Sequence, residues 1–225
     1  MQENIRAYSK NTKLVGRWRN HIAGRAVALF VKKGFEKTSI REIADACGMT
    51  VGNLYRYIGT KEDVLYLVVA KALKKNSSVL KPITDNLGKI SAKELLRAAM
   101  EAYFRGIDEL QDYCLFVYQE TKNLSATAKV SIFQLHIDFV RQFETILNKG
   151  CESGEFKIDN CAAMAQNIVT LGELWAVKRW YFRECIDQQA FVNQQIAFIL
   201  KGIQKDVRIA NDVAAVNTDN YSEWC

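Results

Sequence analysis

The segment TVGNLYRYIGTK, residues 50–61, gathers side chains that hydrogen-bond to nucleic acid. Arg56 can bond to phosphate or guanine, and Asn53 can bond to adenine or phosphate. Lys61 can bind a phosphate oxygen, and Gly52 allows a backbone to approach closely because it has no side chain. These residue types at this spacing indicate recognition of DNA by non-covalent contacts.

The apolar residues of the same segment predict how it is positioned. At 100° per residue, Val51, Leu54 and Ile58 fall on one face of a short helix that Thr50 caps. This stripe is expected to face the protein core. The other side chains are then expected to point outward, with Tyr55 at the edge: Gly52, Asn53, Arg56 and Tyr57.

Another short helix precedes this one, beginning at the capping box Ser39–Glu42 and ending at Gly48. Two short helices joined by a glycine turn, the second exposing polar groups, are typical of a helix-turn-helix that reads the major groove. A longer helix over residues 17–33 is predicted before them, and Thr60 is predicted to cap a fourth. The alternative is a small helical bundle whose tyrosines lie at an ordinary protein interface.

Charge is distributed unevenly along the chain. Residues 1–75 contain 15 Lys and Arg against 6 Asp and Glu, a net charge of +9, whereas residues 76–225 contain 16 against 19, a net charge of −3. A basic N-terminal third beside an acidic remainder fits a nucleic-acid-binding domain joined to a regulatory one. We expect a DNA-binding domain at residues 1–60, a helical ligand-binding and dimerisation domain at 61–206, and a polar tail at 207–225.

The remaining composition predicts the fold class and argues against several functions. The 225 residues include one proline, and apolar residues recur at spacings of three and four, which predicts an all-α protein. No stretch reaches the roughly 20 apolar residues of a membrane span, and the N-terminus lacks the apolar run of a signal peptide. We therefore expect a cytoplasmic protein with no membrane partner.

Catalysis and metal binding are not expected. The sequence lacks the G-x-S-x-G, P-loop and H-E-x-x-H motifs and contains two histidines, His21 and His136. Its six cysteines show neither paired spacing nor a rhythm of metal ligands. We predict no catalytic residue, no metal ligand and no cofactor.

Residues 22–65, IAGRAVALFVKKGFEKTSIREIADACGMTVGNLYRYIGTKEDVL, closely resemble the DNA-binding domain of the tetracycline-repressor (TetR) family. The ungapped match includes Ala-x-x-Leu-Phe, Gly-Phe, Ile-Ala, Gly-x-x-x-Gly-x-Leu-Tyr and Lys-Glu, and departs at Gly59, where many members have Ser, Lys or Asn. The resemblance implies an all-α homodimer, three N-terminal helices for double-stranded operator DNA, and a C-terminal domain whose small-molecule ligand relieves repression. It also implies that Tyr55 and Lys61 lie at phosphates. The candidate DNA-contact residues are Ser39, Thr50, Val51, Gly52, Asn53, Tyr55, Arg56, Tyr57 and Lys61.

The C-terminal two thirds should form the larger helical domain. A fifth helix is predicted from the capping box at Ser91, a sixth at 114–119 and a seventh from about Ser125 to Cys151. An eighth over 159–184 and a ninth over 188–205 are amphipathic neighbours. These last two helices are expected to form a four-helix interface in a homodimer.

Several polar and aromatic side chains lie on apolar helical faces in this domain. A lone histidine such as His136 in such a position is either a satisfied core residue or a hydrogen-bonding group at a ligand, and the same two readings apply to Glu173. Both readings stay open from the sequence. The candidate ligand-binding residues are Tyr103, Tyr118, His136, Phe139 and Trp175.

Residues 119–182 are also similar to TetR members that govern fatty-acid or sterol degradation and respond to acyl-CoA thioesters. That resemblance makes an apolar ligand, with acyl-CoA first, the expected effector of a ligand-responsive repressor. The alternatives are an efflux-pump repressor that senses aromatic or cationic drugs and an architectural DNA binder that senses no ligand.

Overall fold

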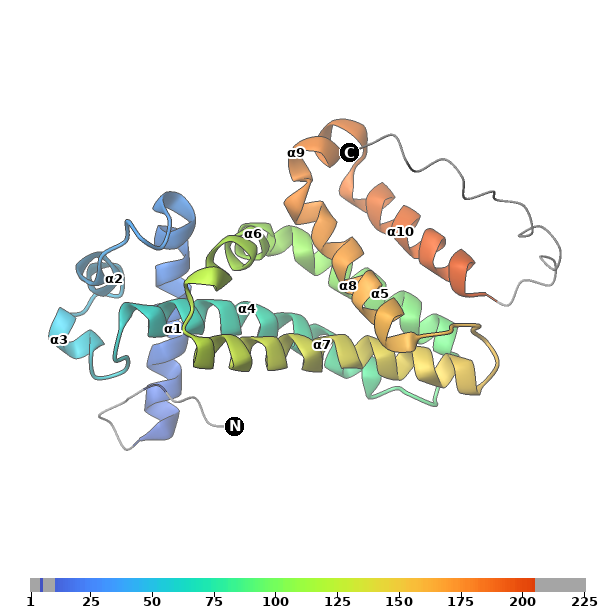
Figure 1. Ribbon diagram of the computed structural model, residues 1–225, viewed down its shortest axis with the longest axis horizontal. Helices are drawn as coiled ribbons and strands as arrows, with labels where there is room; N and C mark the ends of the chain where they lie inside the picture. The colour runs from blue at the N-terminus through green and yellow to red at the C-terminus, as the bar shows by residue number, and fades with distance from the viewer. Residues whose placement is uncertain (1–4, 6–10, 205–225) are drawn as a thin grey trace, which may run out of the picture.

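The computed structural model describes residue 5 and residues 11–204 of the chain (Figure 1). Within these residues the predicted all-α class is confirmed, because the chain forms ten α-helices and one short 3-10 helix, and no strand. None of the described helices is long and apolar enough to cross a bilayer. The predicted tail at 207–225 lies outside the described residues. The helices are α1 Thr12–Lys33, α2 Ile40–Ala46, α3 Val51–Leu54, α4 Lys61–Thr84, α5 Ala92–Glu109, α6 Gln111–Glu120, η1 Thr121–Asn123, α7 Ala126–Glu152, α8 Cys161–Val177, α9 Arg179–Cys185 and α10 Gln188–Ile203.

Helices α1 to α3 form the head, and local caps set their ends. Helix α1 begins five residues earlier than predicted, because the side chain of Asn11 accepts a hydrogen bond from the backbone N–H of Leu14 at 3.0 Å. It ends at Gly34, which has a positive φ of 82°. The ring of Phe35 then packs on Phe30, with 5.5 Å between centroids. The short α2 and α3 are thereby turned back onto α1.

Helix α4 connects the head to the body, which comprises α5 to α10. Thr60 caps its start as predicted, and Asp63 completes a capping box with it. Figure 1 shows α4 lying beside α7 along the long axis of the molecule, with the head at one end. The two ends have separate hydrophobic cores, and the first half of α4 belongs to the core of the head.

Helix α6 of the body also enters the core of the head. The ring of Phe116 stacks on Phe30 of α1, with 5.5 Å between centroids and 8° between planes. Phe116 is therefore buried among head residues and is absent from the core of the body. Leu124 and Ile132, just before and within the start of α7, also belong to this core, so α4, α6 and α7 all connect the head to the body.

The core of the body is rich in aromatic rings. Tyr103 of α5 packs on Phe139 and Phe143 of α7, with centroid distances of 5.0 and 5.8 Å. Helix α8 approaches α5 closely at Gly172, where an added Cβ would lie 2.7 Å from the rings of Tyr103 and Phe104. Glycine at this position therefore permits the close packing of the two helices.

The prediction of one helix over 159–184 is wrong in one respect. The chain forms α8 and α9, which are separated at Lys178. At this residue φ is −110° and ψ is 23°, outside the helical region. The N–H of Lys178 still bonds to the carbonyl of Leu174 at 2.8 Å, so the axis bends while the chain stays hydrogen-bonded. The bend leaves Trp180 of α9 exposed.

Candidate nucleic-acid interface and ligand cavity

The exposed face of the head is formed by α3 and the turn that follows it. Thr50 caps α3, and its hydroxyl accepts a hydrogen bond from the N–H of Asn53 at 3.2 Å. Gly52 is exposed, and no atom would lie within 4 Å of an added Cβ. The side chain of Tyr55 is 40% exposed and Arg56 is exposed beside it. One surface therefore presents the backbone at Gly52, without a side chain over it, together with several hydrogen-bonding side chains.

The expectation that Tyr57 points outward is wrong, because this residue is only 5% exposed. The backbone N–H groups of Arg56 and Tyr57 bond three residues back, to Asn53 and Leu54, so the last turn is tight. At about 120° per residue in such a turn, Tyr57 lies directly over the buried Leu54. Its ring stacks on Trp18 of α1 at 5.6 Å.

A buried arginine fixes this turn to α1. Arg19 is 9% exposed, and its Nε donates to the carbonyl oxygen of Tyr57 at 3.0 Å. One terminal nitrogen also donates to the carbonyl of Ile5 at 2.8 Å. The orientation of the exposed Tyr55 and Arg56 therefore depends on a hydrogen bond and a ring stack beneath them.

The remaining candidate DNA-contact residues lie around α3 in different environments. Ser39 is exposed at the start of α2 and forms the predicted capping box with Glu42. Lys33 pairs with Glu42, and the hydrogen bond from Lys33 lowers the pKa of that carboxyl to about 2. Val51 is half-buried at the first position of α3.

The side chain of Lys61 contacts two backbone carbonyls that follow α1. Its Nζ donates to the carbonyl oxygens of Phe35 and Glu36, at 3.1 and 3.3 Å, and lies 4.3 Å from the centroid of the Phe35 ring. Lys61 is half-buried as the first residue of α4. It therefore ties α4 to the end of α1 and adds positive charge beside α3.

A cavity of about 40 Å³ lies in the body between α4, α5, α6 and α8. Most of its wall is apolar, and its polar groups come from α4, α6 and α8. Glu173 of α8 contributes a carboxylate, and its Oε2 accepts a hydrogen bond from the hydroxyl of Tyr118 at 2.6 Å. The lining residues are Ala72, Leu73, Asn76, Ile107, Leu110, Tyr113, Cys114, Val117, Tyr118 and Glu173.

The electrostatics of this cavity follow from its burial. Burial raises the pKa of Glu173, while the hydrogen bond from Tyr118 and the nearby His136 partly offset the effect. Burial, followed by the charge of Glu173, raises the pKa of the Cys114 thiol to about 12. Cys114 is therefore a neutral thiol, and the carboxyl of Glu173 is the principal polar group that a ligand would meet.

The five candidate ligand-binding residues do not form one site. Tyr118 lines the cavity, and His136 is half-buried with its Nε2 3.0 Å from Oε1 of Gln166. Three of the predicted residues are packed in the core and do not line this cavity, and their contact with a ligand stays a prediction: Tyr103, Phe139 and Trp175. Their aromatic character at helical spacing reflects core packing.

The polar group of Trp175 is satisfied within the core. Its indole N–H donates to Oδ1 of Asp108 at 2.7 Å, and its ring packs on Phe191 of α10 at 5.1 Å. A satisfied polar group in an aromatic cluster needs no ligand. Glu173, weighed but not chosen from the sequence, is the residue of α8 that reaches the cavity, together with Asn76 and Tyr113, for which the sequence held no signal.

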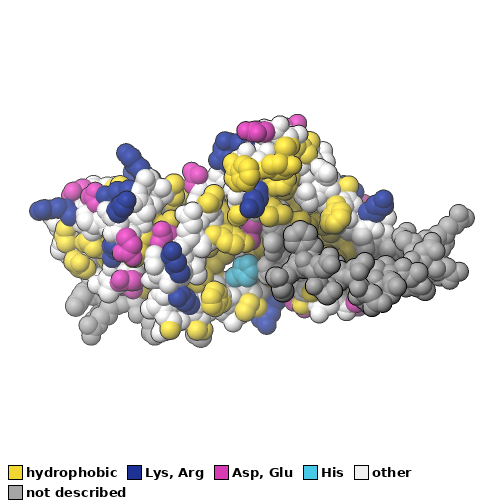
Figure 2. Space-filling view, turned by 45° about the horizontal axis from the view of Figure 1, so that its top comes forward, with side chains coloured by type: hydrophobic (Ala, Val, Ile, Leu, Met, Phe, Trp, Pro, Cys, Tyr) yellow, Lys and Arg dark blue, Asp and Glu magenta, His cyan; other side chains and the backbone are white. Residues whose placement is uncertain are grey.

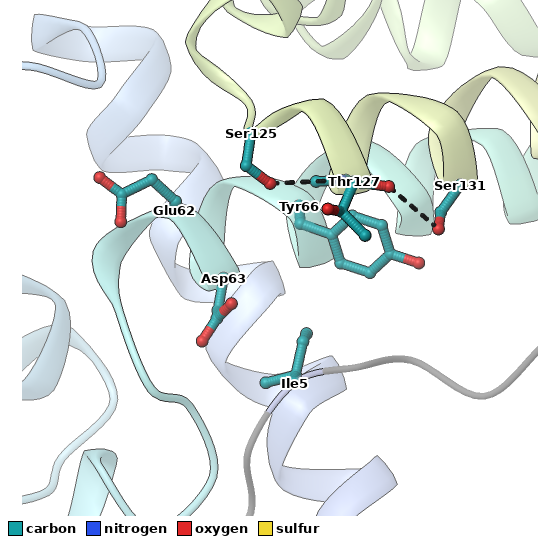
Figure 3. A pocket seen from close by; sticks show the side chains of 8 residues that line it. Ile5, Glu62, Asp63, Tyr66, Ser125, Thr127 and Ser131 are labelled. Atoms are coloured by element: carbon teal, nitrogen blue, oxygen red, sulfur yellow. Dashed lines mark hydrogen bonds between the residues drawn. The ribbon is translucent and has the colours of Figure 1, made fainter.

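A second, more open cavity of about 310 Å³ lies where the head meets the body (Figure 3). Its lining is mostly hydroxyl and carboxylate. Relative movement of the head and body would change its shape, because its walls come from the starts of α4 and α7. The lining residues are Ile5, Glu62, Asp63, Tyr66, Ser125, Thr127, Ala128 and Ser131, all labelled in Figure 3 except Ala128.

Within the described residues, no group of three or more His, Cys, Asp or Glu is placed to hold a metal ion. Five cysteines are described and all are free thiols. The sulfur atoms of Cys151 and Cys161 lie 3.7 Å apart where α7 is followed by α8. The chemistry that the described side chains support is hydrogen bonding and electrostatic attraction.

Two family models match this chain, one in the head and one in the body. A family model described as "Bacterial regulatory proteins, tetR family" matches residues 22–66. A second model, described as "Tetracyclin repressor-like, C-terminal domain", matches residues 89–203. The first match covers the head from residue 22 together with the start of α4, and the second covers α5 to α10 of the body.

Three known proteins show the extent of the similarity. The HTH-type transcriptional regulator HbdR of Aromatoleum sp. (strain CIB) is 26% identical over 200 residues, covering 88% of this chain and 86% of the relative. The HTH-type transcriptional repressor KstR2 of Mycobacterium tuberculosis (strain ATCC 25618 / H37Rv) is 24% identical over 190 residues, covering 84% and 94%. The structure of AibR in complex with isovaleryl coenzyme A and operator DNA is 20% identical, with a TM-score of 0.66, covering 80% and 97%.

Proposed function

This chain belongs to the TetR family of bacterial regulatory proteins, and we propose that it is a repressor released from operator DNA by an acyl-CoA thioester. One observation carries the proposal. A basic head with an exposed polar α3 face is joined, through α4 and α6, to a cavity lined by those same two helices. The matching relatives HbdR and KstR2 are transcriptional regulators. A cytoplasmic location is part of the proposal, because a bacterial repressor must reach chromosomal DNA.

We propose that α3 enters the major groove of the operator. Arg56 bonds to phosphate or guanine, Asn53 to adenine or phosphate, and Gly52 lets the helix approach the sugar-phosphate backbone. The exposed Tyr55 and Lys61 lie at phosphates, with Ser39, Thr50 and Val51 at the edge of the contact. Tyr57 supports this surface from below and does not contact DNA, since its ring is stacked on Trp18.

We propose that the protein acts as a homodimer through α8 and α10. Phe198 of α10 is 68% exposed, although the helix is otherwise amphipathic and packed on the body. A large apolar side chain exposed on a regular helix fits a contact with a second copy. A two-fold dimer presents two α3 helices to half-sites about 34 Å apart, roughly one turn of B-DNA.

The cavity supports an acyl thioester whose acyl group carries a hydrogen-bond donor. Its apolar wall suits hydrocarbon, and Glu173 offers an acceptor with one oxygen already bonded to Tyr118. At about 40 Å³ the cavity is far smaller than the roughly 300–1,000 Å³ of typical ligand sites. Binding must therefore separate the helices that line it, α6 from α4 and α8.

That separation is the proposed release mechanism. Ala72, Leu73 and Asn76 line the cavity from α4, which continues into the head. A ligand lowers DNA affinity only if it prefers the arrangement in which the two heads are wrongly spaced. Because the ligand touches α4 and α6 directly, its binding energy acts on two of the helices that connect the body to the head.

The proposal is tested by titrating labelled operator fragments from near the gene with protein, and then with effectors. Specific retention with a steep salt slope is expected, since each phosphate contact releases counterions. Acyl-CoAs of several chain lengths should release the DNA, while free CoA and aromatic or cationic drugs should not. Release by a drug alone would favour an efflux-pump repressor, and no release by any compound would favour an architectural DNA binder.

The DNA surface is tested by Arg56→Ala with Arg97→Ala as the matched control. Both arginines are exposed, one beside α3 and the other on α5 of the body. Arg56→Ala should weaken operator binding by about 1–3 kcal/mol and Arg97→Ala should not, because only the first faces the groove. Equal operator affinity for parent and Arg56→Ala would exclude this surface.

A further inference from the structure

A third cavity, of about 360 Å³, lies between α6, the end of α8 and α9. It opens on the opposite side of α6 from the cavity at Glu173. Ala176 and Val177 line it from α8, three and four residues beyond Glu173, so the two cavities are one helical turn apart along the same helix. The lining residues are Gln111, Asp112, Leu115, Ala176, Val177, Arg179, Trp180 and Arg183.

Two buried polar atoms of this lining have no hydrogen-bond partner. They are Oε1 of Gln111, an acceptor, and Nε of Arg179, a donor. Buried polar groups are nearly always hydrogen-bonded, so an acceptor and a donor left open in one cavity indicate that a polar molecule completes them. The volume of the cavity exceeds what one water molecule needs and reaches the range of ligand sites.

The charges of the lining select the kind of molecule. Arg179 and Arg183 both face the cavity, and neither forms an ion pair with any side chain among the residues described. Guanidinium groups without a carboxylate partner suit phosphate, which they bind through paired charge-assisted hydrogen bonds. Asp112 adds one acceptor, which fits an amino group on the same ligand.

An aromatic side chain completes the site. Trp180 is 71% exposed, and Figure 2 shows hydrophobic side chains exposed beside Lys and Arg on the upper part of the body, where α9 projects in Figure 1. Its ring is 6.0 Å from that of Tyr181 and is not packed into either core. An exposed indole beside two arginines offers a surface on which a nucleobase can stack.

We propose that this cavity binds the adenine nucleotide end of the CoA thioester, an inference that rests on the proposed function. Arg179 and Arg183 hold the phosphates, Trp180 stacks on the adenine, and Asp112 accepts a hydrogen bond from its amino group. The pantetheine arm then passes along α6 and α8, and the acyl group reaches Glu173. The nucleotide gives affinity at the surface, and the acyl group separates the helices.

The test compares an acyl-CoA with the matching acyl-pantetheine, which carries the same thioester without the nucleotide. The parent dimer should bind acyl-CoA at least about tenfold more tightly, since two charge-assisted contacts and one stacked base are gained. In Arg179→Gln/Arg183→Gln this preference should fall at least about fivefold, with acyl-pantetheine affinity unchanged, because the phosphate contacts are lost while the stacked base remains. Arg97→Gln/Arg141→Gln removes the same charge elsewhere and should keep the preference.

The possible outcomes distinguish failure of the proposed nucleotide site from failure of the proposed acyl-CoA response. A parent that binds acyl-CoA and acyl-pantetheine equally, or a double variant that keeps the preference, overturns the nucleotide site and leaves the acyl-CoA response standing. A parent that binds no acyl-CoA overturns the proposed function. In that case binding of adenosine 3′,5′-bisphosphate tests the nucleotide site without a thioester. Binding that Trp180→Leu weakens about tenfold supports the nucleotide site, and absence of binding overturns it.

Discussion

Replacing Tyr57 by alanine should destabilise the head, whereas the same change at Tyr55 should not. Tyr57 is 5% exposed and its ring stacks on Trp18, so the change removes a buried aromatic ring and leaves a cavity. Aromatic-to-alanine changes in a core cost about 3–5 kcal/mol. Tyr55 is 40% exposed, and a surface change of this kind costs within about 0.5 kcal/mol.

The two variants should therefore separate stability from DNA binding. Unfolding in urea, followed by circular dichroism at one fixed dimer concentration, measures the first, and titration of labelled operator measures the second. Tyr55→Ala should weaken operator binding at unchanged stability. Tyr57→Phe keeps the ring and should keep most of the stability. If Tyr57→Ala unfolded like the parent while Tyr55→Ala unfolded early, the assignment of the two tyrosines would be reversed.

Three further outcomes are expected. Phe116→Leu should cost about 1–2 kcal/mol of stability and weaken the coupling between ligand and DNA by about 0.5–2 kcal/mol, measured as operator affinity with and without saturating ligand. Burial raises the pKa of Glu173 above the usual 4.5, so at pH values between the unfolded and the folded pKa the folded carboxyl keeps a proton that the unfolded one has lost. Stability should therefore fall as pH rises through this range. Glu173→Gln should flatten this part of the plot of urea midpoint against pH. Gly172→Ala should lower the melting temperature because its Cβ would meet two rings at 2.7 Å, whereas Gly106→Ala, with open space around it, should gain about 0.5–1 kcal/mol.

The sequence predicted the parts of the fold that depend on neighbours along the chain. The capping boxes at Ser39, Thr60 and Ser91 each link residues three positions apart, so the pattern contains the whole interaction. Tyr57 was placed wrongly because α3 has only four residues and ends in a tight turn. A helical wheel at 100° per residue no longer applies after Leu54.

The ligand site was less predictable for a different physical reason. Periodicity shows that a face is apolar, but an apolar face can pack on a core or line a cavity. Phe139 and Trp175 have the expected spacing and are fully packed, whereas Glu173 reaches the cavity because of how α6 lies across α8. The bend at Lys178, which exposes Trp180, could not be predicted because no proline or glycine lies beside it in the sequence.

The position of α6 explains how one small cavity could control a distant surface. One face of this helix lines the cavity through Cys114 and Tyr118, and the opposite face carries Phe116 into the core of the head. Moving a population from nearly all bound to nearly all released requires a preference of about 5.5 kcal/mol, so each site of a dimer would supply about half of that. A ligand that must open the cavity to enter gains its contacts only in the opened arrangement, which gives the differential affinity that release requires. The closed cavity is therefore an argument for a switch, because a preformed pocket of full size would bind ligand equally well in both arrangements and release nothing.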